Sequence, residues 1–158
     1  MTSTVTQIVG CGAQEIEMNQ VRPNYALRIV LGAIGAVIVF LGINVGFGGI
    51  QTLGLQGGSG LFLSITDEAL FAVRDNHIRF IGGVWLALGL LMLAGSVAFR
   101  RLRPVLVALT AMVFVGGLAR LSAADLGPLF TADLAPSMIF EIVVMPLLGL
   151  WFAKAEAV

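Results

Sequence analysis

The chain has 158 residues, of which 58% are hydrophobic and only 11% are charged, and nine basic side chains balance nine acidic ones. An ordinary soluble domain carries about 25% charged residues, so this composition, with a mean hydropathy of +1.00, indicates an integral membrane protein. The basic run from Arg100 to Arg103 is too short for a nucleic-acid site. We therefore exclude nucleic acid as a partner and expect membrane lipids instead.

Residues 1–25 form the first predicted region, an N-terminal cytoplasmic segment. It has neither the basic start nor the long apolar core of a secretory signal peptide. Met18 is an alternative start, which leaves open whether residues 1–17 belong to the native protein. Cys11 is the only cysteine in the sequence, so an intramolecular disulfide, and with it a disulfide-exchange function, is excluded.

Residues 26–153 contain four apolar runs and form the predicted transmembrane domain. A helix of about 20 residues crosses the hydrocarbon layer with its backbone groups hydrogen-bonded. The runs extend from about Leu27 to Ile50, Ile78 to Phe99, Pro104 to Leu121 and Pro136 to Ala153. Pro104 and Pro136 suit the first turn of a helix, and Pro146 is expected to bend the last one. The predicted fold is an all-α membrane protein, a four-transmembrane-helix bundle.

The segment between the first two runs is long enough to need structure of its own. Ser64-Ile65-Thr66-Asp67 resembles a capping box, and acidic Asp67 and Glu68 suit a helix start. The apolar residues of the following ALFAV would lie on the membrane surface. We therefore expect a short interfacial helix between the first and second transmembrane helices.

The positions of Lys and Arg predict the orientation in a bacterial inner membrane. With both termini in the cytoplasm, that side carries Arg22, Arg28, Arg100, Arg101, Arg103 and Lys154. The outer side carries only Arg74, Arg79 and Arg120. Since cytoplasmic segments are enriched in Lys and Arg, we expect both termini inside, with residues 154–158 as a cytoplasmic tail.

Glycines mark the helix faces on which close packing is expected. In the first run, glycines recur in steps of three and four once Val39 is included, which indicates a left-handed helix crossing. These glycines are Gly32, Gly35, Gly42, Gly46 and Gly49. Gly82, Gly83, Gly116 and Gly117 are the further packing candidates. The partner of the first stripe is another helix of the chain or, alternatively, a second copy, because the motif alone does not identify it.

Three charged side chains are predicted to meet near the outer ends of the helices. Arg79 opens the second helix, Arg120 closes the third, and Glu141 lies shortly after the start of the fourth, so an antiparallel arrangement brings them to one depth. Charges inside a bilayer are costly and usually find partners. We therefore expect Glu141 to bridge Arg79 and Arg120.

Neighbouring polar residues extend this predicted cluster. Asp75 precedes Arg79 by four residues, a favourable order for an ion pair on a helix, and Asn76 and His77 lie beside it. The cluster has two interpretations: a structural one, in which buried ions fix helix register, and a functional one, in which a surplus positive charge binds a small anion or an acidic headgroup. One His and one distant Cys offer no metal ligand set, so neither a metal nor another cofactor is expected.

No catalytic motif is present in the sequence. It lacks a nucleophile beside a base, paired carboxylates with room for a water, and a phosphate-binding glycine loop, so we expect no enzymatic activity. Two functions remain. The narrowly favoured one is a packing or accessory subunit of a membrane complex or homo-oligomer, which the glycine stripe supports. The alternative is a binder or transporter of a small anionic or amphipathic molecule, such as a lipid, through an Arg79-Arg120-Glu141 pocket near the outer face.

The sequence also resembles the domain-of-unknown-function 4345 family of small bacterial four-helix membrane proteins. The resemblance covers about Arg22 to Phe152. It is carried by residues 75–83, Gly89, Arg103-Pro104, residues 116–122, Gly127-Pro128 and Glu141. The resemblance implies that the arginines and the glutamate of the predicted cluster belong to the family pattern, and it implies no activity.

Overall fold

The structure, a computed structural model, describes residues 25–55, 65–123, 125–131 and 134–155. The predicted N-terminal segment up to residue 24, with Cys11, Met18 and Arg22, lies outside the described residues. Ser64 and the tail beyond Ala155 also lie outside them.

The described residues form helices and contain no strand. In chain order, these are α1 (Tyr25–Gly48), η1 (Ile50–Leu55), α2 (Glu68–Val97), α3 (Phe99–Arg120), η2 (Gly127–Phe130), α4 (Ala135–Ile139), η3 (Phe140–Val144) and α5 (Met145–Lys154). The last three run on as a single helix, Ala135–Lys154, so that four helices are long and apolar enough to cross a membrane. The prediction of an all-α fold with four such helices is confirmed.

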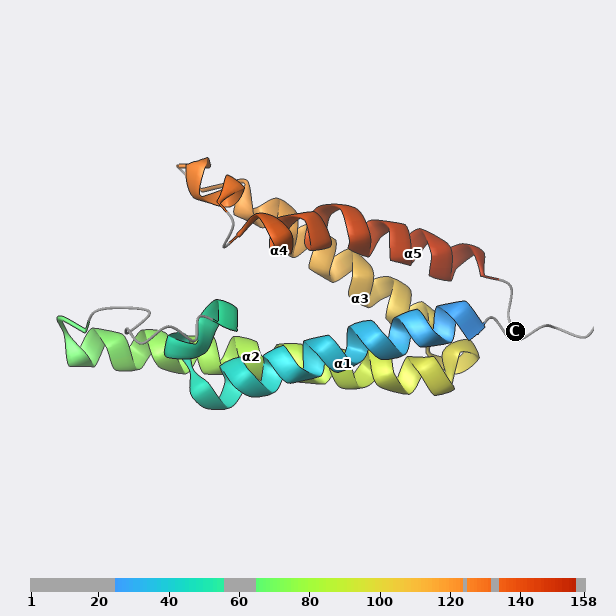
Figure 1. Ribbon diagram of the computed structural model, residues 1–158, viewed down its shortest axis with the longest axis horizontal. Coiled ribbons are helices and arrows are strands. Elements are labelled where there is room, and N and C mark those ends of the chain that lie inside the picture. Colours follow the sequence, from blue (N-terminus) through green and yellow to red (C-terminus); the bar gives the residue numbers. More distant parts are fainter. Residues whose placement is uncertain (1–24, 56–64, 124, 132–133, 156–158) are drawn as a thin grey trace, which may run out of the picture.

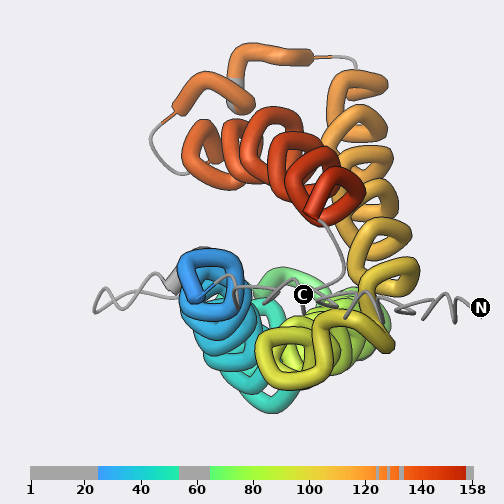
Figure 2. The backbone as a smooth tube through the Cα atoms, turned by 90° about the vertical axis from the view of Figure 1, so that its right-hand side faces the viewer, coloured from blue at the N-terminus to red at the C-terminus, as the bar shows by residue number. Residues whose placement is uncertain are grey.

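The long helices pair as two antiparallel hairpins, α1 with α2 and α3 with Ala135–Lys154, which we call the α1–α2 and α3–α5 hairpins (Figure 1). Seen along their length, the helices of one hairpin lie above those of the other (Figure 2). The hairpins converge where α1 begins, α2 meets α3 and α5 ends, which is the closed end of the molecule. They diverge toward the opposite, open end (Figure 1).

Apolar side chains from all four long helices join the two hairpins. This core extends from the closed end toward the middle of the molecule and consists of Leu27, Leu31, Met92, Phe99, Leu106, Leu109, Met145, Leu148 and Phe152. At the closed end, the rings of Phe99 and Phe152 meet edge to face with centroids 5.9 Å apart, a favourable aromatic arrangement. Apolar burial therefore holds the hairpins together where they converge.

Inside the α1–α2 hairpin, the two backbones touch along glycines. The contact residues of this seam are Gly35, Gly42, Gly46, Gly82 and Gly89. A Cβ atom added at Gly89 would stand 2.6 Å from the Val39 nitrogen, and one at Gly42 would stand 2.6 Å from the Leu86 Cα atom. Only glycine fits such an approach. The stripe on α1 therefore packs against α2 of the same chain.

The helix predicted to lie separately on the membrane surface is part of α2. This helix begins at Glu68, well before the predicted start at Ile78, and the Asp67 side chain caps it by accepting a hydrogen bond from the Leu70 N–H at 3.0 Å. No glycine or proline interrupts the sequence from Glu68 to Ile81, so the helix continues without a break. The prediction of a separate interfacial helix is therefore not confirmed.

The start of α3 also differs from the prediction. This helix begins at Phe99 because the charged stretch from Arg100 to Arg103 forms its first turns instead of a loop, and Ala98 alone separates it from α2. Pro104 therefore lies inside the helix, and its predicted place in the first turn is wrong. Pro136 does lie in the first turn of its helix, as predicted.

The last long helix contains a π-helical turn where the sequence predicted a bend. The turn, η3, directly precedes Met145 and Pro146, and the Met145 N–H donates to the Phe140 carbonyl five residues back. Pro146 lacks a donor, and a proline ring crowds the carbonyl four residues before it. The irregularity expected near Pro146 is thus a widened turn, a feature often found at functional sites.

Candidate functional site

Arginines close both hairpins at the closed end by binding helix C-termini. Arg28 Nε, near the start of α1, donates to the Ser96 carbonyl near the end of α2 at 2.7 Å. Arg103 of α3 donates from Nε to the Phe152 carbonyl at 2.9 Å and from Nη2 to the Ala153 carbonyl. The last carbonyls of a helix lack intrahelical partners and carry its negative dipole end, so a guanidinium suits them.

The open end of the α1–α2 hairpin is tied by Asp75 and Arg79. Arg79 Nε donates to Asp75 Oδ2 at 2.6 Å, and Arg79 Nη1 donates to the Phe47 carbonyl at the end of α1. Asp75 Oδ1 accepts a hydrogen bond from the Ile50 N–H at 2.8 Å. Gly49, with a φ of 75°, makes this turn, since a side chain there would strike the Asp75 carboxylate.

The open end of the α3–α5 hairpin is closed by a different ion pair. Arg120 Nη2, in the last turn of α3, lies 2.8 Å from Glu141 Oε1. Glu141 is in the π-helical turn, and Gly117 lets this turn approach α3. A Cβ atom at Gly117 would stand 2.8 Å from the Glu141 Cβ atom. The pair therefore depends on a close helix contact as well as on charge.

The predicted cluster is thus divided between the hairpins. Glu141 pairs with Arg120, but no ion pair joins Glu141 to Arg79 among the described residues. The physical reason is the divergence of the hairpins at the open end, which leaves Arg79 with Asp75 on its own helix. The side chains of Asn76 and His77 are exposed and are hydrogen-bonded to neither ion pair, so they do not extend either pair.

Two of the predicted packing glycines face outward instead. A side chain at Gly83 or Gly116 would meet no atom within 4 Å, whereas their neighbours Gly82 and Gly117 make the close helix contacts. Gly32 lies at an ordinary packing distance from Ser96. Gly83 and Gly116 therefore do not pack against another helix of this chain, because neighbouring helix positions point about 100° apart.

Glu141 is shielded from solvent but incompletely hydrogen-bonded. Its side chain is 14% exposed and that of Arg120 is 32% exposed. The Glu141 Oε2 atom is buried and has no hydrogen-bond partner among the described residues. A buried polar atom without a partner is uncommon and costly, which makes this oxygen the most unusual polar atom that we find in the described part of the chain.

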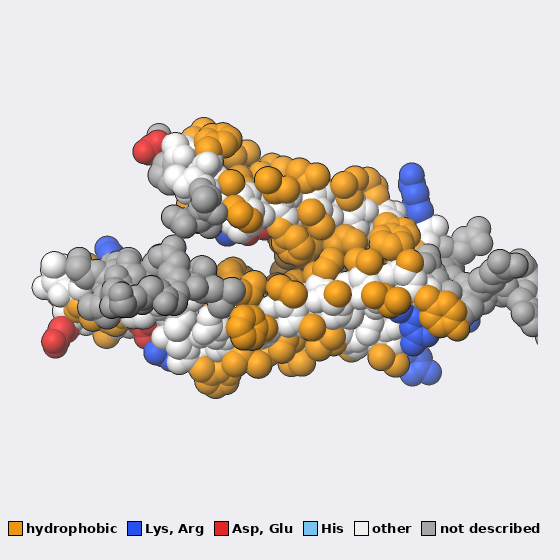
Figure 3. All heavy atoms as spheres, viewed as in Figure 1, with side chains coloured by type: hydrophobic (Ala, Val, Ile, Leu, Met, Phe, Trp, Pro, Cys, Tyr) orange, Lys and Arg blue, Asp and Glu red, His pale blue; other side chains and the backbone are white. Residues whose placement is uncertain are grey.

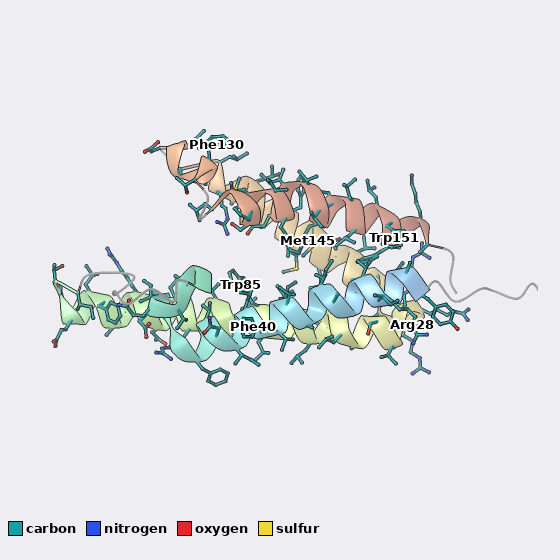
Figure 4. All side chains as sticks on the ribbon, in the orientation of Figure 1. Arg28, Phe40, Trp85, Phe130, Met145 and Trp151 are labelled. Carbon is teal, nitrogen blue, oxygen red and sulfur yellow. The ribbon has the colours of Figure 1, made fainter. Side chains whose placement is uncertain are left out.

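The hairpins enclose a hollow at the open end, which we call the opening. The space-filling view shows the hollow between the two hairpins, with acidic and basic side chains meeting on its upper wall, which the α3–α5 hairpin forms (Figure 3). Trp85 of α2 points toward the space between the hairpins, and Met145 of α5, which is buried in the core, points toward it from the opposite side (Figure 4). Phe130, on η2, points away from it. The walls are therefore mainly apolar, with charge at one side.

Sequence reasoning missed several contacts inside the α3–α5 hairpin. Thr110 is buried and donates to the Val107 carbonyl at 2.8 Å. A side chain at Gly149 would stand 2.5 Å from the Thr110 hydroxyl oxygen, so this glycine is a contact point. The sequence signal for this contact is Gly149 itself, an isolated glycine in the fourth apolar run, because small residues in membrane helices often mark close contact with a neighbouring helix.

Comparisons with known proteins identify one related family. The model of a family described as "Domain of unknown function (DUF4345)" matches residues 26–152. This range includes all the residues of both open-end ion pairs. Searches of curated proteins and of solved structures found no match.

Proposed function

Since the chain belongs to the family described as "Domain of unknown function (DUF4345)", which names no activity, we propose its function from the geometry of the opening. The chain is a non-catalytic, multi-pass protein of a bacterial inner membrane that binds an amphipathic membrane molecule between its hairpins. The carrying observation is the opening itself, with mainly apolar walls and the Arg120–Glu141 pair on one hairpin.

The charge distribution supports an orientation for this site. Basic side chains gather at the closed end (Figure 3), and the described ones there are Arg28, Arg100, Arg101, Arg103 and Lys154. The positive-inside rule then favours a cytoplasmic closed end. The opening faces the outer half of the bilayer, and the Arg120–Glu141 pair lies within the membrane, near its outer surface.

Apolar walls favour an amphipathic occupant over a polar one. An apolar surface in a membrane is solvated by hydrocarbon chains, and an unfilled space beside it would lose dispersion contacts. A chain entering beside Trp85 would restore those contacts, while a polar group at its end would reach the ion pair. Binding therefore uses both parts of an amphipathic molecule.

Tryptophan fluorescence offers a direct test. Trp85 and Trp151 are the only tryptophans, so Trp151→Phe leaves Trp85, at the opening, as the sole reporter. We expect a bromine-labelled alkyl amphiphile to quench Trp85 saturably in detergent. In the matched control, Trp85→Phe, we expect the remaining Trp151 to show only weak, non-saturable quenching. Equal, non-saturable quenching of both tryptophans would contradict the proposal.

An accessory role in a membrane complex remains the second candidate. The glycine stripe of α1, on which the sequence based this role, packs against α2 and is not free for a partner. Gly83 and Gly116, however, face open space. Exposed small residues allow a partner helix to approach closely. Purification from native membranes followed by mass spectrometry distinguishes the roles, since a stoichiometric protein subunit lost from Gly83→Leu would favour the accessory role and a retained lipid would favour binding.

A further inference from the structure

Each arginine of the predicted cluster is paired with its own carboxylate. The sequence predicted two arginines against one carboxylate, which would leave a positive charge for an anion unless Asp75 or Asp125 contributed. Instead Arg79 is paired with Asp75 and Arg120 with Glu141. The basis for an anionic ligand is therefore lost, because a second carboxylate or a phosphate would have to displace Glu141 from Arg120 or remain beside it unpaired.

The ion pair offers one acceptor that the protein does not use. Glu141 Oε1 is bound to Arg120, whereas Oε2 has no hydrogen-bond partner among the residues described. The last torsion of a glutamate side chain is broad, so its carboxylate can rotate without movement of the backbone. A partial rotation, unlike a full exchange of the two oxygens, would bring Oε2 out of its shielded position beside Gly117 while the carboxylate stays beside Arg120.

A hydroxyl group fits this arrangement better than a charged group. A hydroxyl is both a donor and an acceptor, and the Arg120 guanidinium carries five N–H donors, of which the bond to Glu141 engages the Nη2 group. One hydroxyl can therefore donate to Glu141 and accept from Arg120 without separating the pair. An ammonium group would compete with Arg120 for the carboxylate, and a carboxylate would compete with Glu141 for the arginine.

We propose that the polar group recognised in the opening is an uncharged hydroxyl on a long apolar chain, hydrogen-bonded to Glu141 and Arg120. This inference rests on the proposed function and adds the chemical class of the ligand. Glu141 is the acceptor in this site, and the π-helical turn together with Gly117 positions its side chain against α3.

Three probes with the same chain and different polar ends test the inference. They are ω-bromoundecanol, ω-bromoundecanoate in its ionised form, and bromoundecane, each titrated into the full-length Trp151→Phe protein in detergent. We expect the alcohol to quench Trp85 at a concentration about tenfold lower than either other probe, the size expected for a hydrogen bond to a charged group. Equal or tighter binding of the carboxylate would overturn the inference.

A variant then locates the hydroxyl. Glu141→Gln keeps the shape of the side chain but removes its charge, so we expect it to abolish most of the preference for the alcohol over bromoundecane. An undiminished preference would overturn the assignment to Glu141. If Glu141→Gln fails to fold, the comparison of the three probes in the Trp151→Phe protein, which retains Glu141, still tests the inference. If the probes bind saturably but equally, this inference fails and the proposed function stands; if none quenches Trp85 saturably, the proposed function fails.

Discussion

The two hairpins have the same closure at one end and different interiors. At the closed end, an arginine binds the C-terminal carbonyls of the partner helix in both. Between the ends, the α1–α2 hairpin presses backbone against backbone along five glycines. The α3–α5 hairpin has close glycine contacts, among its described residues, only at Gly117, which packs against the π-helical turn, and at Gly149. A seam of glycines in backbone contact leaves no space between the helices for a charged side chain. The looser hairpin therefore holds the carboxylate that has an unused oxygen.

The largest effect is expected from filling the glycine seam. Gly82→Leu would force a side chain into the Gly46 backbone, while Gly83→Leu, one residue on, would meet open space. Overpacking costs about 1–3 kcal/mol and more when backbone must move, so we expect the first variant to lose most of its folded fraction. Thermal unfolding in detergent, followed by circular dichroism, measures the difference. Equal stability of the two variants would contradict backbone contact as the basis of the seam.

A smaller effect is expected from the ion pair of the α3–α5 hairpin. Removing one partner of a fully buried pair costs about 3–5 kcal/mol, and the 32% exposure of Arg120 reduces this to about 1–3 kcal/mol after solvent screening. Arg120→Gln should therefore lower the unfolding temperature, and adding Glu141→Gln should restore part of the loss. A double-mutant cycle on the free energy of unfolding measures the coupling. Additive losses would show that the two side chains do not stabilise each other.

The pair of the α1–α2 hairpin should matter least for global stability. The Arg79 side chain is 42% exposed, and exposed pairs contribute about 0–1 kcal/mol. Asp75→Ala should instead remove the hydrogen bond that the Ile50 N–H donates to the Asp75 carboxylate. Hydrogen exchange at Ile50 should accelerate while the unfolding temperature changes little. Unchanged exchange at Ile50 would mean that the Asp75 carboxylate does not hold this turn.

The sequence identified the spans better than their ends. Hydropathy marks where a helix can lie in lipid, and it located α1 and the last helix within a few residues. Helical turns built from polar residues, such as those around Arg74 and Arg100, carry no hydropathy signal and were assigned to loops or to a separate helix. Asp67 indicates a helix start, and because no glycine or proline follows it before Gly82, that helix continues into the second span.

The sequence predicted the depth of the charged residues but not their neighbours. Antiparallel crossing places Arg79, Arg120 and Glu141 toward one end of the molecule, and this much follows from counting spans. Which side chains meet depends on how the hairpins diverge, and that divergence is a tertiary property with no local pattern. The same holds for Gly82 and Gly83, which differ only in the direction they face.

The single-residue junction at Ala98 makes the open end sensitive to small rotations. Because α3 has 22 residues, it is about 33 Å long at about 1.5 Å per residue. A change of about 5° in its direction at Ala98 would shift its far end by about 3 Å. That distance approaches the separation of two carbon atoms in contact, about 3.5–4.0 Å. A small change of direction at Ala98 would therefore change the separation of the hairpins at the open end by nearly one such contact distance.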